Sequence, residues 1–162
     1  MQVLHTSTVL AEEIDSLGHM NVRYYMTRMQ SANRLLVDTL GIDPGVLEHS
    51  FLRSVDTYTR FRNEQFEGAT LQTVGGLLSM GEGGVQSYVE IRNPDTDAVA
   101  ATFVVTTALI DRKTRDTQTL PIPTGNISGS TYIDIPAYAQ PRSLTLGPAK
   151  TDITLEVLQN TI

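Results

Sequence analysis

The stretch from Asp15 to Tyr25 reads D-S-L-G-H-M-N-V-R-Y-Y, and it gathers an acid, a glycine, a histidine and an asparagine just before an amphipathic segment. In that segment, apolar residues recur every three or four positions from Val22 up to Gly41, which is the spacing of one long helix. Asn21 stands directly before the first periodic position, where an N-cap is expected. Glycine at the other end is typical of a helix C-terminus. This stretch therefore predicts a helix that begins immediately after a polar loop.

The segments on either side of the helix favour strands. Residues 2–10 are rich in β-branched residues and contain no breaker, and residues 54–62 alternate between apolar and polar side chains. Residues 71–80 and 85–92 are separated by a G-E-G-G turn and are typical of a hairpin. Residues 98–110 are apolar on both faces, which predicts a central strand. One helix on one face of a curled antiparallel sheet is a two-layer α+β fold.

The carboxy-terminal part of the chain differs in composition from the rest. Five of the seven prolines follow Arg112. We therefore expect residues 1–112 to form the domain and residues 113–162 to form an irregular arm, packed on the same domain or on a neighbouring subunit. Within the arm, T-D-I-T-L-E-V-L at residues 151–158 is expected to be a short ordered piece. Gly41, followed by Asp43, Pro44 and Gly45, predicts the end of the long helix.

Composition excludes several classes of function. The chain has 162 residues, enough for one domain, and a formal net charge of −6, which argues against nucleic-acid or membrane partners because phosphate binding needs a basic surface. It has no cysteine, so thiolate metal sites and disulfides are excluded. The N-terminus lacks the basic and apolar regions of a signal peptide, and no apolar run is long enough to span a bilayer. We expect a cytoplasmic protein with no metal and no cofactor.

The polar loop before the helix has the parts of an acyl-transfer site. Unpaired N–H groups at a helix N-terminus carry partial positive charge and can stabilise an oxyanion. Asp15 brings a carboxylate to that terminus, and His19 adds a group that exchanges protons near neutral pH. Gly18 lets the backbone bend closely around a ligand. Each of these residues taken alone is more often structural, as a cap or a solvated side chain.

The string D-x-x-G-H-x-N-x-x-Y-Y, placed after one strand and before a long helix, resembles the hotdog-fold thioesterases. It is most similar to the 4-hydroxybenzoyl-CoA thioesterase-like group, including its betainyl-CoA thioesterase-like relatives, and it is similar to acyl-ACP thioesterases in the D-x-x-G-H-x-N loop. The resemblance covers residues 2 to about 112. It implies a hotdog fold, in which a curled antiparallel sheet of about five strands wraps one long helix, and hydrolysis of an acyl-CoA or acyl-ACP thioester.

The resemblance also implies catalytic residues. In the 4-hydroxybenzoyl-CoA type, the acid of the motif is catalytic, which is Asp15 here, and the amide of Val22 would polarise the thioester carbonyl. In the acyl-ACP type, the histidine and asparagine contribute, and these positions are His19 and Asn21. Because the first type has apolar residues at those two positions, the role of Asp15 stays open between nucleophile and general base, and the pair favours activation of water.

Further residues are candidates for substrate binding. The coenzyme A phosphates require basic residues, and guanidinium groups bind phosphates well. Solvated strand ends are an equally good explanation for such arginines. The candidates that line or flank the expected site are Gly18, Tyr24, Tyr25, Arg60, Arg62 and Glu64, and a second basic group comprises Arg112, Lys113 and Arg115. His5 and His49 have no matching partner and are expected to be structural.

Two other functions remain open from the sequence. One is an enoyl-thioester hydratase or dehydratase on the same fold, and the other is a module that binds acyl thioesters without hydrolysing them. The resemblance also implies a homodimer that joins sheets edge to edge, or a homotetramer of two such dimers. One helix leaves sheet edges and apolar surface that a second copy can cover.

Overall fold

A computed structural model describes residues 1–121 and 132–141 of the chain. The elements follow in the order β1 (Gln2–Thr8), the 3₁₀ helix η1 (Ala11–Glu13), α1 (Val22–Asp38), α2 (Pro44–His49), β2 (Ser50–Phe61), β3 (Thr70–Gly81), β4 (Gly84–Asn93), β5 (Ala98–Asp111), β6 (Thr117–Gln118) and the 3₁₀ helix η2 (Ala137–Ala139). The expected segment at residues 151–158 lies outside the described residues.

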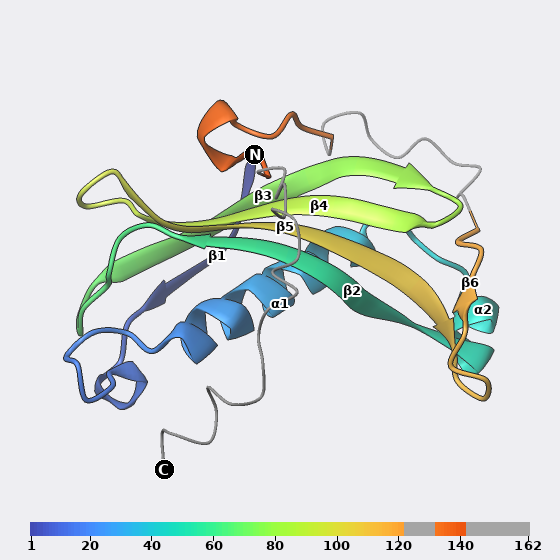
Figure 1. The fold of residues 1–162 in the computed structure, drawn as a ribbon, viewed down its shortest axis with the longest axis horizontal. Coiled ribbons are helices and arrows are strands. Elements are labelled where there is room, and N and C mark those ends of the chain that lie inside the picture. The colour runs from blue at the N-terminus through green and yellow to red at the C-terminus, as the bar shows by residue number, and fades with distance from the viewer. Residues whose placement is uncertain (122–131, 142–162) are drawn as a thin grey trace, which may run out of the picture.

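The strands form one antiparallel sheet in the order β1-β3-β4-β5-β2, and the short β6 pairs with β5. The sheet curves around α1, which runs across one face (Figure 1). A curled antiparallel sheet around one long helix confirms the predicted α+β hotdog architecture. The predicted position of residues 98–110 is confirmed as well, since β5 is paired on both sides and buried along most of its length.

The main core lies between α1 and the concave face of the sheet. Met29, Ala32 and Leu36 of α1 are fully buried there, at the helical spacing that the sequence predicts. They pack in one cluster with apolar side chains of the sheet, which include Phe103 and Val89. Because each strand alternates its side chains, only one set of each strand faces the helix. This packing fixes the position of α1 and of the loop before it.

The opposite, outer face of the sheet is covered by residues 132–141, which we call the outer strap. In Figure 1 the strap lies across the sheet from α1. Ala139 of the strap is buried in a second cluster with Tyr88 and Val104, and Ile133 and Ile135 pack against it. The strap is also held by the Tyr138 hydroxyl, which donates to the buried carboxylate of Glu90 at 2.6 Å. The sheet is therefore covered on both faces within one chain.

β2 is an edge strand of the sheet. It pairs with β5, and in the described part of the chain no strand pairs with its other edge. The register between the two strands shifts between Ser54 and Asp56, which places a bulge at Val55 in the middle of β2. A long free edge is where a sheet can accept a second chain.

Three short helices, η1, α2 and η2, are absent from the sequence prediction. Asp43, Pro44 and Gly45, which follow the predicted end of the long helix, cap and begin α2. The Asp43 side chain accepts a hydrogen bond from the Gly45 N–H at 2.7 Å, and proline occupies the first helical turn, where its missing N–H costs nothing. The same three residues suit a turn or a capped helix start, and packing against β2 selects the helix.

Candidate active site

The loop that joins η1 to α1 is closed by its own backbone. The Asp15 N–H donates to the His19 carbonyl at 3.0 Å, and the Gly18 N–H donates to the Asp15 carbonyl at 3.0 Å. Gly18 has φ of +86°, a left-handed conformation that glycine adopts without strain. The Asp15 carboxylate accepts the Leu17 N–H at 2.9 Å. The loop is therefore a tight turn that presents His19 and Asp15 beside each other.

The same loop ends in a capped helix N-terminus. The Asn21 side chain accepts a hydrogen bond from the Arg23 N–H at 3.0 Å, which confirms the predicted cap. The Asn21 N–H donates to the Glu13 carbonyl at 2.9 Å. The next N–H, that of Val22, has no acceptor among the residues that the structure describes. It is an unpaired donor at the positive end of the α1 dipole.

Two carboxylates flank His19. Its Nδ1 lies 3.9 Å from Asp15 Oδ1, and its Nε2 lies 3.6 Å from Glu64 Oε1. The side chains of His19 and Asp15 are both about one-quarter exposed, whereas that of Glu64 is largely exposed. These separations exceed those of hydrogen bonds, as is common in sites before substrate binds. An imidazole between two carboxylates can accept and pass on a proton.

A cavity of about 310 Å³ opens at this cluster, between the start of α1 and the end of β2. It is lined by His19, Met20, Val22, Tyr25, Phe61, Arg62, Asn63 and Glu64. Burial raises the pKa of Tyr25 to about 12, so its hydroxyl keeps its proton at neutral pH. That hydroxyl donates to the Asn63 carbonyl at 3.4 Å. Tyr25 is therefore a donor and a wall of the cavity, and not a base.

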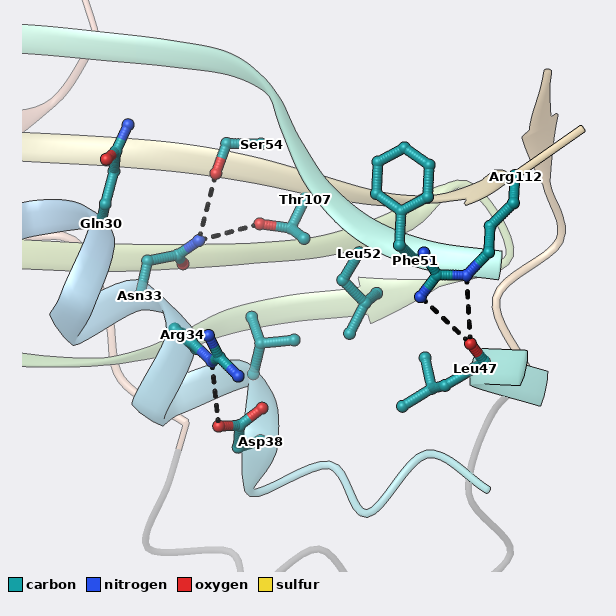
Figure 2. Close-up of a pocket in the computed structure, with 11 residues that line it drawn as sticks. Gln30, Asn33, Arg34, Asp38, Leu47, Phe51, Leu52, Ser54, Thr107 and Arg112 are labelled. Atoms are coloured by element: carbon teal, nitrogen blue, oxygen red, sulfur yellow. Dashed lines mark hydrogen bonds and ion pairs between the residues drawn. The ribbon is translucent and has the colours of Figure 1, made fainter. Parts of the chain in front are cut away.

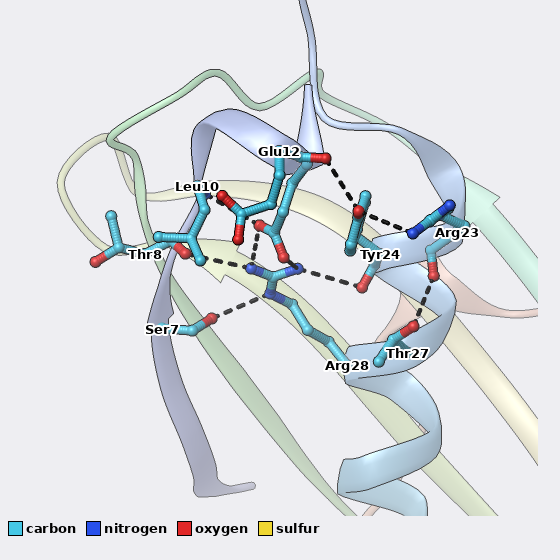
Figure 3. A network of polar contacts seen from close by, with 9 residues as sticks. Ser7, Thr8, Leu10, Glu12, Arg23, Tyr24, Thr27 and Arg28 are labelled. Atoms are coloured by element: carbon cyan, nitrogen blue, oxygen red, sulfur yellow. Dashed lines mark hydrogen bonds and ion pairs between the residues drawn. The ribbon is translucent and has the colours of Figure 1, made fainter. Parts of the chain in front are cut away.

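A buried ion pair anchors the start of this loop to α1. The Arg28 guanidinium donates to both carboxylate oxygens of Glu13, at 3.1 and 2.7 Å, and both side chains are about nine-tenths buried. Arg28 also donates to Ser7 of β1, and Figure 3 shows it reaching from α1 to that strand. The Tyr24 hydroxyl donates to the Glu12 carbonyl at 3.0 Å. These contacts tie β1 and η1 to the helix and so fix where the loop begins.

The structure brings some of the predicted site residues into the cavity and leaves others outside it. His19, Val22, Tyr25, Arg62 and Glu64 line it, whereas Asp15 lies beside His19 and Asn21 caps the helix. Gly18 shapes the loop, and Tyr24 faces η1. The sequence offered no signal for Phe61 and Asn63, because only the pairing of β2 with β5 brings the end of β2 beside the helix start.

The predicted phosphate-binding arginines have protein partners. Arg60 and Arg62 both donate to the main-chain carbonyl of Tyr138 in the outer strap, at 2.7 and 3.1 Å. The Arg62 guanidinium also lies 5.3 Å from the Tyr138 ring centroid. Arg112 is at the other end of β2, where it donates to the Leu47 carbonyl. The arginines are thus held in place by main-chain oxygens, which leaves other guanidinium donors for a ligand.

Within residues 1–121 and 132–141, no group of three or more acidic or histidine side chains is arranged to hold a metal ion. In the same part of the chain, no helix has the length and apolar character needed to cross a membrane.

Comparison with known proteins agrees with this architecture. Residues 9–128 match a family model described as the thioesterase-like superfamily. The comparison with curated proteins gave no match. Among solved structures, a hypothetical protein from Staphylococcus aureus in complex with CoA is similar with a TM-score of 0.67 and 20% identity, over 91% of this chain and 95% of that one.

Two further solved structures have similar scores. A probable thioesterase from Escherichia coli gives a TM-score of 0.62 at 19% identity, over 74% of this chain and 90% of that one. A 1,4-dihydroxy-2-naphthoyl-CoA thioesterase from Synechocystis gives a TM-score of 0.62 at 13% identity, over 72% of this chain and 88% of that one. At these identities the structures establish a common fold.

Proposed function

The chain belongs to the thioesterase-like superfamily, and from this premise we propose that it hydrolyses acyl-coenzyme A thioesters to a free carboxylic acid and coenzyme A. One observation carries the proposal. Val22, whose N–H at the start of α1 is unpaired among the described residues, and His19 line the same cavity, and Asp15 lies 3.9 Å from His19 Nδ1. An oxyanion donor and a proton acceptor facing one cavity are what acyl transfer to water requires.

In the proposed reaction, the thioester carbonyl oxygen accepts a hydrogen bond from Val22 N–H. Asp15 and His19 together take a proton from a water molecule, and the water oxygen bonds to the carbonyl carbon. The negative charge that develops on the carbonyl oxygen is stabilised by the N–H and by the α1 dipole. The carbon–sulfur bond then breaks, and the departing thiolate receives the proton. A thioester is already activated, so no metal is needed for this sequence.

We assign Asp15 to water activation in preference to direct attack. Its Oδ1 already accepts the Leu17 N–H and faces His19, and His19 and Glu64 line the cavity whereas Asp15 does not. A carboxylate in this position orients the imidazole more readily than it reaches a carbonyl carbon. After turnover in heavy-oxygen water, the peptide that contains Asp15 should be unlabelled. Label in its carboxylate would contradict the assignment, because it would show an acyl-enzyme anhydride.

The nucleotide part of coenzyme A is assigned to Arg60 and Arg62. Both guanidinium groups lie at the end of β2 that borders the cavity, and Arg62 lines it. The solved Staphylococcus aureus protein of the same fold contains CoA. Guanidinium groups bind phosphate bidentately, so two of them beside the cavity suit the pyrophosphate and phosphate groups.

A homodimer completes the proposed enzyme. The free edge of β2 can pair with the same edge of a second copy, which joins the two sheets through a twofold axis near the bulge at Val55. Antiparallel pairing about that axis places the beginning of one β2 beside the end of the other. Residues near Phe51 of one copy then face the cavity that contains Glu64 in its partner.

The assignment is tested by substituting the acid of the loop. Asp15→Asn keeps the acceptor for the Leu17 N–H but removes the charge, so we expect an intact fold and a kcat for acyl-CoA hydrolysis lowered by about 10²- to 10⁴-fold. His19→Ala removes the proton acceptor that lines the cavity, so it should lower kcat by at least as much. Release of the CoA thiol, followed with a thiol reagent over short, long, branched and aromatic acyl groups, measures both. Near-normal hydrolysis by Asp15→Asn would refute the assignment.

A further inference from the structure

A second cavity, of about 360 Å³, lies at the far end of the same crevice between α1 and β2. Figure 2 shows its lining from four elements, with Asn33 on α1, Leu47 on α2, Phe51 on β2 and Thr107 on β5. Asn33 and Val22 stand eleven residues apart on α1, which is roughly 16 Å along the helix axis. This cavity is therefore separate from the one at the catalytic loop of the same chain.

This cavity has an apolar wall, a polar floor, and further polar and charged lining residues, which are Gln30, Arg34, Asp38 and Arg112. Val37, Leu47, Phe51 and Leu52 provide the apolar wall. At the floor, the Asn33 amide donates to the Thr107 hydroxyl at 3.0 Å and is 3.4 Å from the Ser54 hydroxyl (Figure 2). From behind, the Ser87 hydroxyl donates to the Asn33 carbonyl oxygen at 2.5 Å. Asn33 is 95% buried on a helix face whose other buried residues are mainly apolar.

Packing alone does not require this polar group. Leucine has the same number of side-chain heavy atoms and the same branching as asparagine, and a fully apolar floor would continue the core formed by Met29 and Leu36. The hydroxyl of Ser54 is on the open side of the cavity, since Ser54 is exposed. The Asn33 amide reaches it only at the outer limit of hydrogen-bond distance. A ligand oxygen that lies between Ser54 and Asn33 could accept hydrogen bonds from both the Ser54 hydroxyl and the Asn33 amide.

We propose that this cavity binds the acyl group of the thioester, and that Asn33, Ser54 and Thr107 select an acyl group that is compact and carries a hydroxyl or carbonyl oxygen. The inference rests on the proposed function and on the twofold dimer, which places the cavity of one copy beside the catalytic loop of its partner. A volume of about 360 Å³ is at the small end for ligand sites, which suits a ring or a short chain. A long alkyl chain would strip water from the polar floor without replacing its hydrogen bonds.

The charged residues at the rim of this cavity are compatible with an acyl group that is neutral and carries an oxygen atom. Arg34 lies at the rim and is 3.8 Å from Asp38, and Arg112 donates to the Leu47 carbonyl (Figure 2). The charge of Arg34 is therefore already paired with a carboxylate, and Arg112 is held against a main-chain oxygen. The selective contacts come from the uncharged side chains at the floor.

The test compares CoA thioesters that differ by one hydroxyl: 3-hydroxybutyryl-CoA with butyryl-CoA, and hydroxybenzoyl-CoA with benzoyl-CoA. In the wild-type protein we expect kcat/KM to favour the hydroxylated member of at least one pair by about tenfold, because a site built for hydrogen bonding penalises the analogue that lacks the group. Asn33→Leu should abolish that ratio. Thr107→Val, which removes only a hydroxyl, should reduce it and provides a second variant if Asn33→Leu fails to fold.

Thr106→Val is the matched control. Thr106 is adjacent to Thr107 on β5 but faces the outer side of the sheet, where its hydroxyl accepts from Gln86. This variant should keep the wild-type ratio. A wild-type preference for the unsubstituted member of both pairs would overturn the inference, and so would a ratio that Asn33→Leu and Thr107→Val leave unchanged. If the wild-type protein hydrolyses none of the four thioesters nor any in the broader panel, the proposed function itself fails.

Discussion

The buried hydroxyl of Tyr25 makes the stability of the fold depend on pH. Burial raises its pKa from 10.0 to about 12, so above pH 10 the unfolded chain loses this proton while the folded chain keeps it. The unfolded state then binds fewer protons, and the free energy of unfolding falls as pH rises. Burial also raises the pKa of Tyr88 and of Tyr138, in the same direction.

We therefore expect the urea midpoint to decrease between pH 10 and pH 12, the window set by the two pKa values of Tyr25. Tyr25→Phe should make the decrease less steep, since it removes one of the groups that titrate. Equilibrium unfolding followed by circular dichroism at several pH values measures both. A midpoint that stays constant over this range in the wild-type protein would contradict the burial of these hydroxyls.

At the level of single residues, local features follow from the sequence, whereas the geometry of contacts between distant residues depends on the fold. Asn21 as a cap and Gly18 at a bend follow from their immediate neighbours, because capping and left-handed backbone are local properties. The approach of Glu64 to His19 depends on where the sheet places the end of β2. The same is true of Asn33, which the periodic pattern places on the buried face but whose partners, Thr107 and Ser87, lie on two strands far along the chain.

The element that most depends on one interaction is η1 with the loop that follows it. The ion pair of Arg28 and Glu13 is about nine-tenths buried, and losing one partner leaves the other charge without compensation. This pair could not be predicted from the sequence, because Glu13 and Arg28 are fifteen residues apart and only the packing of η1 against α1 brings them together.

Arg28→Met should lower the free energy of unfolding by about 3 kcal/mol, because it keeps the side-chain stem but strands the Glu13 carboxylate. It should also reduce kcat, since the loop that carries Asp15 loses its anchor. The matched control is Arg34→Met, whose exposed ion pair with Asp38 should contribute about 0–1 kcal/mol. Chemical denaturation of the two variants checks this, and equal losses would show that burial of the first pair has no energetic consequence.

For the whole molecule, the decisive prediction concerns the second copy. Asp15→Asn disables the catalytic loop, and Gln30→Trp places a large side chain at the exposed wall of the far cavity. If the cavity of one copy serves the loop of its partner, the mixed dimer of these two inactive variants has one intact site, and activity returns. If each chain uses its own cavity, both sites of the mixed dimer are damaged.

The experiment uses two differently tagged variants that are coexpressed and purified through both tags. We expect thiol release from the mixed dimer and almost none from either parent. Wild-type chains carrying the same two tags are the control for the effect of tagging. Failure to recover activity from a correctly mixed dimer would place the whole site within one chain.

The overall architecture was accessible from the sequence, whereas the cover on the outer face was not. One long segment whose apolar residues recur every 3.6 residues, followed by several segments in which they recur every two residues, is enough to specify a helix on an antiparallel sheet. The outer strap has no such period, because its apolar residues Ile133, Ile135 and Ala139 are spread among prolines and polar residues. Their burial follows from the shape of the sheet that they cover.

The outer strap has a consequence for how the chain acquires its structure during synthesis. The sheet is complete once Gln118 has emerged from the ribosome, but Tyr88 and Val104 stay uncovered until Ala139 follows. Contacts between residues this far apart in sequence form late, because a long loop must close first. During that interval the nascent chain exposes an apolar sheet face, the condition in which folding intermediates aggregate. Docking of the strap is the step that ends this vulnerable period.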